Sequence, residues 1–168
     1  MNKPIVIVNG SGGVGKTTFE NLISKYKNVF IVSSVDKIKE AARILDWDGS
    51  KDEKSRKFLS DLKLLSIDYN DAPFNYIAKY IEYFQNSDKE IMMIDIRDLF
   101  EIDRVKKDFN AIALLIKNNR ISAIKTNVAD ANVENYKYDY IIENNGTLEQ
   151  FEIKAYDFLC WLIEKTEE

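Results

Sequence analysis

The strongest constraint on this chain is a glycine-rich stretch that directly follows a short apolar run. Residues 10–17 read Gly-Ser-Gly-Gly-Val-Gly-Lys-Thr and match the pattern G-x-x-x-x-G-K-[ST] without a gap. The preceding residues 5–8, Ile-Val-Ile-Val, are strand-like, and an amphipathic helical pattern follows the stretch. Glycines allow the turns that direct successive backbone N–H groups at one anion, and a helix N-terminus adds partial positive charge. The sequence therefore predicts a strand–loop–helix unit that binds a polyphosphate.

Each position of this loop has an expected role in holding Mg·ATP. Lys16 would reach the β- and γ-phosphates, and the Thr17 hydroxyl would hold Mg²⁺. ATP and Mg²⁺ are therefore the expected cofactors. The residues that we expect to surround the nucleotide are Gly10, Ser11, Gly12, Gly13, Val14, Gly15, Lys16, Thr17 and Thr18.

Apolar runs and helical patterns alternate along the rest of the chain. Four of the five runs are nearly continuously apolar, which suits strands that are covered on both faces. The alternation predicts one α/β domain over residues 1–168, a doubly wound and roughly five-stranded parallel sheet with helices on both faces. The expected strands are Ile5–Asn9, Val29–Ser33, Ile91–Ile96, Ala111–Ile116 and Tyr138–Ile142, and the expected helices are Gly15–Lys25, Val35–Ile44, Leu99–Asp108 and Leu148–Glu164.

A long helical insertion, residues 45–88, separates the second and third expected strands. Two apolar stripes in it recur at helical spacing. We expect both to pack as helix–helix core, in preference to forming a flat aromatic surface for bases. The first stripe is Phe58, Leu62 and Leu65, and the second is Phe74, Ile77, Tyr80, Ile81 and Phe84.

Composition excludes several classes of site and partner. The chain has no histidine, which excludes histidine-based zinc hydrolases and Ser-His-Asp or Cys-His catalysis. The single Cys160 excludes an internal disulfide and a cysteine-cluster metal site. No apolar run approaches the ~20 residues that span a bilayer. With a net charge of −4 and no basic stretch, neither a nucleic acid nor a membrane is an expected partner, and the cytoplasm is the expected compartment.

Two other nucleotide-binding classes share parts of these patterns. The partitioning-type ATPases also contain GGVGKTT, but they carry an extra lysine just before the paired glycines, where this chain has Ser11. Residues 127–130, Asn-Val-Ala-Asp, resemble the N-K-x-D guanine motif, but valine replaces the lysine that packs on the base. No D-x-x-G follows the third expected strand. Both classes are therefore disfavoured.

Phosphoryl transfer needs cations that hold the acceptor phosphate and neutralise the transferred group, and the planar, permanently charged arginine side chain suits this role. Arg97 is the most informative of the five arginines, because it directly follows the apolar run over 91–96. Asp95 lies two residues earlier and would share its strand face. We expect both to project toward the phosphates, with Asp95 near Mg²⁺ or orienting an acceptor group.

The other cations admit simpler interpretations. Arg56 suits a solvated helix face equally well. Lys39 and Arg43 lie four residues apart, so they could form a basic ridge or pair with neighbouring acids. Arg104 lies among other charged residues and is expected at the surface.

With these residues, the chain resembles the bacteriophage-type deoxynucleoside monophosphate kinases, within the P-loop nucleoside monophosphate kinase group. Beyond the loop, the likeness is carried by residues 34–41, by Asp95-Ile96-Arg97 with the helix over 101–105, and by residues 138–149. The loop is typical of P-loop proteins at large. The D-x-R strand end and the N-N-G-T turn narrow the resemblance to kinases.

The resemblance implies transfer of the γ-phosphoryl group from ATP to a small-molecule acceptor, a nucleoside or deoxynucleoside monophosphate, giving the diphosphate. Residues 36–88 would form a helical acceptor-binding insertion, and residues 117–136 a short lid-like segment. The residues implied for the acceptor are Asp36, Lys39 and Arg56, those for the adenine side are Asn145 and Gly146, those for catalysis are Lys16, Asp95, Arg97 and Arg120, and those for the metal are Thr17 and Asp95.

The chain departs from the wider kinase group at the lid, where adenylate-kinase-like lids bring several arginines. Residues 117–136 offer only Lys117, Arg120 and Lys125. Animal-type phosphomevalonate kinases share the same partial match, so another small phosphate monoester is an alternative acceptor. A nucleotide-binding regulatory protein with weak ATPase activity is the alternative of a different class. Either a monomer or a homodimer fits the sequence.

Overall fold

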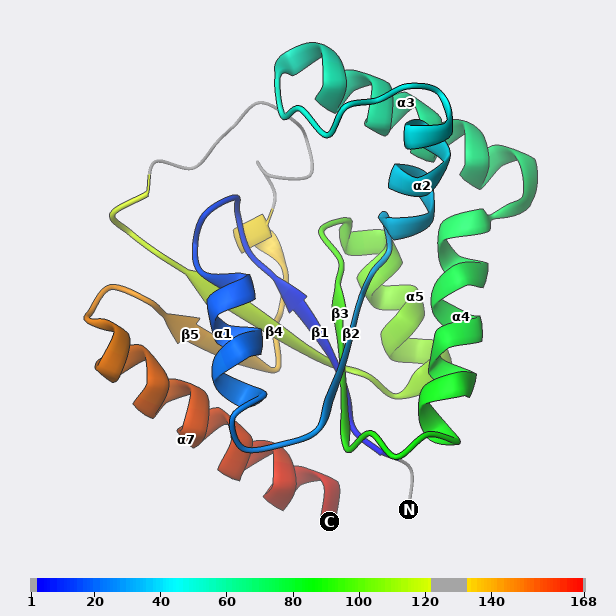
Figure 1. Ribbon diagram of the computed structural model, residues 1–168. Coiled ribbons are helices and arrows are strands. Elements are labelled where there is room, and N and C mark those ends of the chain that lie inside the picture. Colours follow the sequence, from blue (N-terminus) through cyan, green and yellow to red (C-terminus); the bar gives the residue numbers. More distant parts are fainter. Residues whose placement is uncertain (1–2, 122–132, 168) are drawn as a thin grey trace.

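Five parallel strands form one sheet through the centre of the molecule (Figure 1). The computed structural model describes residues 3–121 and 133–167. The strand order is β2-β3-β1-β4-β5, so β1 lies in the middle and all neighbouring strands run parallel. The strands are β1 (Ile5–Asn9), β2 (Val29–Ser33), β3 (Ile91–Asp95), β4 (Ile112–Lys117) and β5 (Tyr140–Glu143). This confirms the predicted doubly wound α/β sheet.

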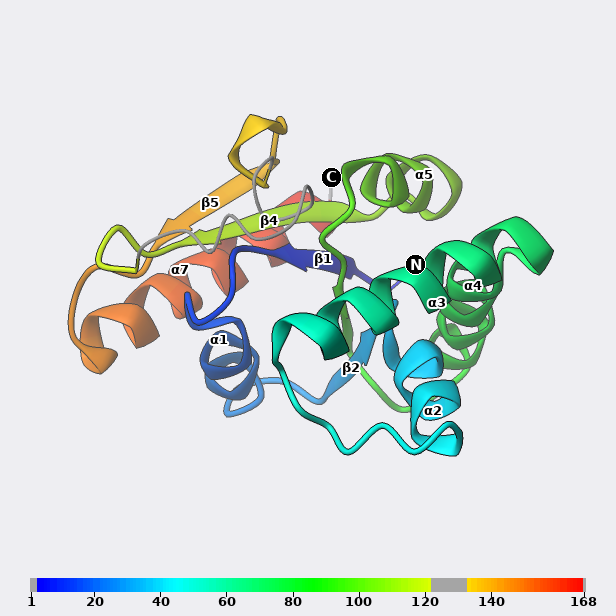
Figure 2. The same ribbon diagram turned by 90° about the horizontal axis from the view of Figure 1, so that it is seen from above.

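Helices cover both faces of this sheet, as Figure 2 shows from above. Buried side chains of α1 and α7 pack on one face, and those of α4 and α5 pack on the other. Because successive residues of a strand point to opposite faces, the apolar β1 and β3 can supply both cores. The helices are α1 (Lys16–Ile23), α2 (Asp36–Ile44), α3 (Glu53–Asn70), α4 (Ala72–Gln85), α5 (Leu99–Phe109) and α7 (Leu148–Glu167), with a 3₁₀ turn, η1 (Val133–Asn135).

The two predicted stripes of the insertion have different fates. The second stripe lies on α4, and its buried residues share one core cluster with residues of the sheet and of α5, so the stripe packs against the sheet as well as against a helix. The first stripe lies on α3, which buries only Ser55 among its described residues. Its Leu65 is 66% exposed, so the prediction of a buried stripe is wrong there. Helix α3 therefore has little apolar anchoring, and Figure 1 shows it with α2 beyond the carboxyl ends of the strands.

The bounds of β1 and β2 match the predictions, and the ends of the other predicted elements differ by at most three residues. Strand β4 extends to Lys117 and β5 begins at Tyr140, because pairing with the neighbouring strand decides where a ladder ends. Arg104 was predicted to lie at the surface, but its side chain makes contacts within the protein. Its guanidinium pairs with Asp71 and lies 3.4 Å from the ring centroid of Phe74, so it joins α5 to α4.

Among the described residues, none of the helices combines the length and apolar character that a membrane crossing requires. The segment 127–130, with its partial guanine motif, lies outside the described residues.

Replacing Phe158 with alanine tests the core that supports the sheet. This ring is fully buried and contacts the rings of Phe19, Tyr140 and Trp161. The Phe158→Ala variant should lose about 3–5 kcal/mol of unfolding free energy in urea, because it removes apolar contacts and leaves a cavity. The matched control is Phe100→Ala, which removes a ring that is 79% exposed and should change that free energy by less than about 0.5 kcal/mol.

Candidate active site

The glycine loop lies between β1 and α1, at the carboxyl edge of the sheet. Gly10 has a φ of +149°, and a Cβ atom there would lie 2.5 Å from the Ile116 carbonyl oxygen. Gly15 caps α1 with a φ of +110°, and a Cβ there would lie 2.6 Å from Asn144 Nδ2. Both positions therefore require glycine, for conformation and for space. At these two positions the flanking strand and turn leave no room for a side chain.

Lys16 is the first residue of α1, and its ammonium group reaches back across the loop. Its Nζ donates to the carbonyl oxygens of Gly10 at 2.7 Å and Ser11 at 3.1 Å. An anion held by the loop amides would thus lie within reach of a fixed positive charge, next to the N-terminus of a helix. The exposed Thr17 follows directly on the first turn of α1.

The turn after β5 supports the loop from the side. Asn144 Nδ2 donates to the Val14 carbonyl oxygen at 2.9 Å, and Asn145 Oδ1 accepts from the Asn119 N–H at 2.8 Å. The turn therefore links the glycine loop to the chain after β4. The expected capping box is present, since the Thr147 N–H donates to Gln150 Oε1 and the Gln150 N–H to Thr147 Oγ1.

Asp95 ends β3 beside the loop, because Val8 of β1 is its partner in the ladder. Burial raises the pKa of its carboxyl group. The charges of Lys16, Arg97 and Lys39 act in the opposite direction and lower that pKa, while Asp36 raises it. These charged groups come from three segments of the chain, the start of α1, the first turns of α2 and the end of β3, so the fold gathers them at one place. Asp95 Oδ1 is buried and has no hydrogen-bond partner among the described residues.

Glu20 is a second buried carboxyl group at this site, and sequence reasoning missed it. It lies one helical turn after Lys16, is 4% exposed, and its Oε1 has no hydrogen-bond partner in the described part of the chain. Burial and the nearby Asp95 raise its pKa to about 7, although Lys16 acts to lower it. The signal was present in the sequence, because Glu20 falls among Phe19, Leu22 and Ile23 on the buried face of α1.

The other predicted site residues lie on separate segments of the same edge. Asp36 begins α2, where its Oδ2 accepts from the Ser33 N–H at 2.7 Å, and it faces Lys39 at 4.0 Å. Arg56 is exposed in the first turn of α3. Arg120 is exposed in the turn after β4, where its N–H donates to Asn118 Oδ1. Of the lid-like segment 117–136, residues 122–132, including Lys125, lie outside the described residues.

A partly buried ion pair, which the sequence did not indicate, connects α3 of the insertion to α5. Lys63 Nζ of α3 lies 2.7 Å from Glu101 Oε2 of α5, and the two side chains are only 19% and 11% exposed. Ser34 Oγ donates to the same carboxylate oxygen at 3.3 Å. Because the partners are 38 residues apart in sequence, no local spacing could predict this pair.

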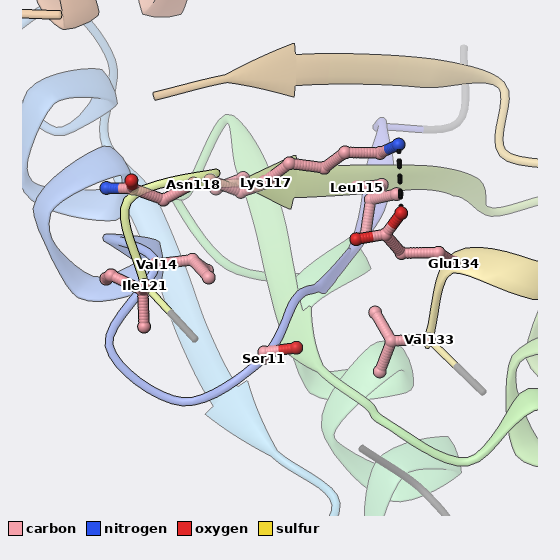
Figure 3. Close-up of a pocket in the computed structure, with 9 residues that line it drawn as sticks. Ser11, Val14, Leu115, Lys117, Asn118, Ile121, Val133 and Glu134 are labelled. Atoms are coloured by element: carbon pink, nitrogen blue, oxygen red, sulfur yellow. Dashed lines mark hydrogen bonds and ion pairs between the residues drawn. The ribbon is translucent and has the colours of Figure 1, made fainter. Parts of the chain in front are cut away.

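A small cavity lies behind the phosphate loop, between Ser11, Val14, the end of β4 and η1 (Figure 3). Its volume is about 30 Å³, room for roughly one water molecule, so it is not a nucleotide site. Lys117 and Glu134 form an ion pair of 3.3 Å beside it, drawn dashed in Figure 3.

Comparison with solved structures identifies the fold. The chain superposes on dephospho-CoA kinase from Campylobacter jejuni with a TM-score of 0.55, 18% identity and coverage of 95% of this chain and 97% of that one. For thymidylate kinase from Ehrlichia chaffeensis the TM-score is 0.56 and the identity 14%, with coverage of 95% of this chain and 99% of that one. For shikimate kinase from Aquifex aeolicus the TM-score is 0.51 and the identity 10%, with coverage of 97% of this chain and 98% of that one. The chain has the fold of the P-loop kinases.

At these identities the likeness concerns the fold alone. Comparison of the sequence with models of known families and with curated proteins finds no match.

Gly15→Ala tests the packing of the loop against the turn after β5. The new methyl group would have to adopt a φ of +110° and overlap Asn144 Nδ2, so we expect at least tenfold weaker Mg·ADP binding by calorimetry. The control is Gly49→Ala, which also has positive φ, at +90°, but meets nothing within 4 Å. That variant should lose only about 1 kcal/mol of stability. Equal nucleotide affinity in both variants would contradict the packing described here.

Glu20→Gln tests the buried carboxyl group through pH. The folded-state pKa of Glu20 is about 7 against an ordinary value of 4.5, so its contribution to stability is complete below pH 4.5 and declines as pH rises to about 7. The decline from this group reaches about 3 kcal/mol. The neutral glutamine should remove that part of the decline in urea unfolding measured without nucleotide from pH 5 to 8. The exposed Glu82→Gln variant, as control, should keep the wild-type profile.

Proposed function

We propose that this protein transfers the γ-phosphoryl group of Mg·ATP to a nucleoside or deoxynucleoside monophosphate. The observation that carries the proposal is the Lys16 ammonium lying across a glycine loop, beside Asp95 and within the same cluster of charges as Arg97 and Lys39. Lys16 and the glycine loop suit the donor phosphates, and Arg97 and Lys39 offer positive charge to the phosphate of an acceptor. The kinase structures that share the fold support phosphoryl transfer as the reaction class.

The donor side consists of the loop, Lys16 and the turn after β5. Loop amides and Lys16 would hold the β- and γ-phosphates, while Asn145 and Gly146 lie on a turn that contacts the loop and would border the adenine. Thr17 and Asp95 fit Mg²⁺, which takes hard oxygen ligands and is held by one or two protein groups together with substrate phosphates. The unpartnered buried oxygen of Asp95 is the feature that such an ion would satisfy. When bound, Mg²⁺ would neutralise charge on the transferring phosphates.

The acceptor side is the edge formed by β3 and the helices of the insertion. Arg97 and Lys39 act on Asp95 electrostatically, so an acceptor phosphate near them would lie next to the donor loop. Asp36, Lys39 and Arg56 occupy the start of α2 and of α3, which bound this edge. Arg120, in the turn after β4, would supply a further cation to the transferring group. Proposed catalysis consists of positioning and charge neutralisation, without a covalent enzyme intermediate.

Substrate identity can be tested with an assay that couples ADP release to a visible reaction. Mg·ATP is supplied with each common nucleoside and deoxynucleoside monophosphate, and in parallel with phosphomevalonate. We expect ADP release that depends on one or a few of the monophosphates. Release without any acceptor would instead indicate an ATPase, and dependence on phosphomevalonate alone would identify a different acceptor class.

The role of Lys16 is tested by Lys16→Ala in the same assay. Loss of the ammonium group removes charge stabilisation of the transferring phosphoryl, so turnover should fall at least about 100-fold. Its ammonium group donates to carbonyl groups of the loop, so the circular dichroism spectrum should remain that of the wild type. The control is Lys25→Ala at the surface end of α1, where Lys25 pairs with Glu152, and it should keep wild-type turnover. Near-normal turnover of Lys16→Ala would overturn the proposal.

A further inference from the structure

Asn9 is a fully buried polar residue at the point where β1 becomes the phosphate loop. Its exposed fraction is 0%, and both ends of its amide group are used. Oδ1 accepts from the Gly10 N–H at 2.7 Å, and Nδ2 donates to the Tyr138 hydroxyl at 2.8 Å. The Gly10 N–H is thus engaged by a side chain, while its carbonyl oxygen accepts from Lys16. The N–H and the carbonyl group of Gly10 are therefore both fixed in direction.

Tyr138 carries the connection onward to η1. Its hydroxyl accepts from Asn9 and donates to the Val133 carbonyl oxygen at 2.7 Å. Burial raises the pKa of Tyr138 to about 12, although the bond from Asn9 acts to lower it, so the hydroxyl keeps its proton at neutral pH. Val133 and Glu134 line the cavity behind the loop, opposite Ser11 and Val14 (Figure 3). The chain of bonds therefore runs from Gly10, next to one wall of this cavity, to Val133 in the other wall.

We propose that Asn9 and Tyr138 form a positioning pair that holds the start of the phosphate loop in its nucleotide-binding shape by tying Gly10 to η1. This inference rests on the proposed binding of Mg·ATP by the loop. Neither residue belongs to the glycine-loop pattern, and in this proposal neither contacts the nucleotide. They act through Gly10, whose orientation sets where the carbonyl that faces Lys16 lies.

The physical reason is that a buried hydrogen-bond network has one satisfied arrangement. Removing the Tyr138 hydroxyl leaves the Asn9 amide and the Val133 carbonyl without their partners, and a buried unpaired donor is costly enough to make side chains move. Asn9 can regain a partner only by rotating, and rotation releases the Gly10 N–H. The loop would then sample other shapes, and phosphate binding would require their loss.

Tyr138→Phe is the variant that tests this pair, and Tyr136→Phe is its matched control. Tyr138→Phe keeps the ring, including its contact with the Tyr136 ring at 5.0 Å between centroids. Tyr136→Phe also removes a tyrosine hydroxyl bond in the same segment, but that hydroxyl donates to Asp103 of α5 and has no link to the loop. A second variant, Asn9→Ser, interrupts the chain from its other end with a side chain too short to reach Tyr138.

Mg·ADP binding by calorimetry, the split between KM for ATP and kcat, and hydrogen exchange of the Gly10 amide are measured for each folded variant. Tyr138→Phe and Asn9→Ser should each weaken Mg·ADP binding and raise KM about tenfold, leave kcat within about twofold, and speed Gly10 exchange. Tyr136→Phe should match the wild type in all of these measurements.

The outcomes separate this inference from the proposed function. If the wild type itself binds no Mg·ADP, the proposed function fails. If the wild type binds it and Tyr138→Phe binds it as tightly, with unchanged Gly10 exchange, the positioning pair is refuted. A lower unfolding midpoint with unchanged nucleotide affinity would show that the bonds serve stability alone, which also refutes the inference.

Discussion

The pairing of β1 with β3 is the interaction on which the rest of the site depends. Val8 lies opposite Asp95 in this ladder. The start of the glycine loop and the last residue of β3 therefore lie at the same edge of the sheet. A parallel sheet places every strand's carboxyl end on one side, and ligands bind there at the point where the chain crosses between faces. The loop, Asp95 and the start of α2 share that edge for this reason.

Burial at this edge has an electrostatic consequence. Glu20 and Asp95 are carboxyl groups that burial makes harder to ionise, and Lys16 is the cation near both. Residues with raised carboxyl pKa values beside a fixed positive charge are typical of sites that bind or transfer charged groups. Within the part of the chain that the structure describes, the core thus carries carboxylate oxygens without a hydrogen-bond partner near the glycine loop, while its other buried side chains are almost all apolar.

The insertion contrasts with this rigid edge. Helix α4 is bound to the sheet by apolar side chains, whereas α3 buries one described residue and is connected to α5 by the Lys63–Glu101 ion pair. An element with so few apolar contacts is drawn from the less stable part of a structure. Under the proposed function this insertion would bind the acceptor, and the polar attachment of α3 would let it adjust.

The sequence by itself determined the phosphate loop, the alternation of strands and helices, and the place of Asp95 and Arg97 at a strand end. These features depend on local spacing and on glycine chemistry, which are readable along the chain. Arg97 and Lys39 could be named as cations, but whether they face Asp95 depends on strand order. The burial of the first stripe of α3 was predicted wrongly, because helical spacing shows which residues share a face and not what covers that face.

Only the tertiary structure decided the contacts between distant segments. The Lys63–Glu101 pair and the bonds from Asn9 to Tyr138 join residues far apart in the chain, for which no pattern within one element carries a signal. Tertiary packing also turned Glu20 into a buried acid with a pKa of about 7, since the desolvation that raises it comes from the surrounding elements. Local spacing and residue type can be read along the sequence. Burial and the coupling of charges arise only when folding brings distant segments into contact.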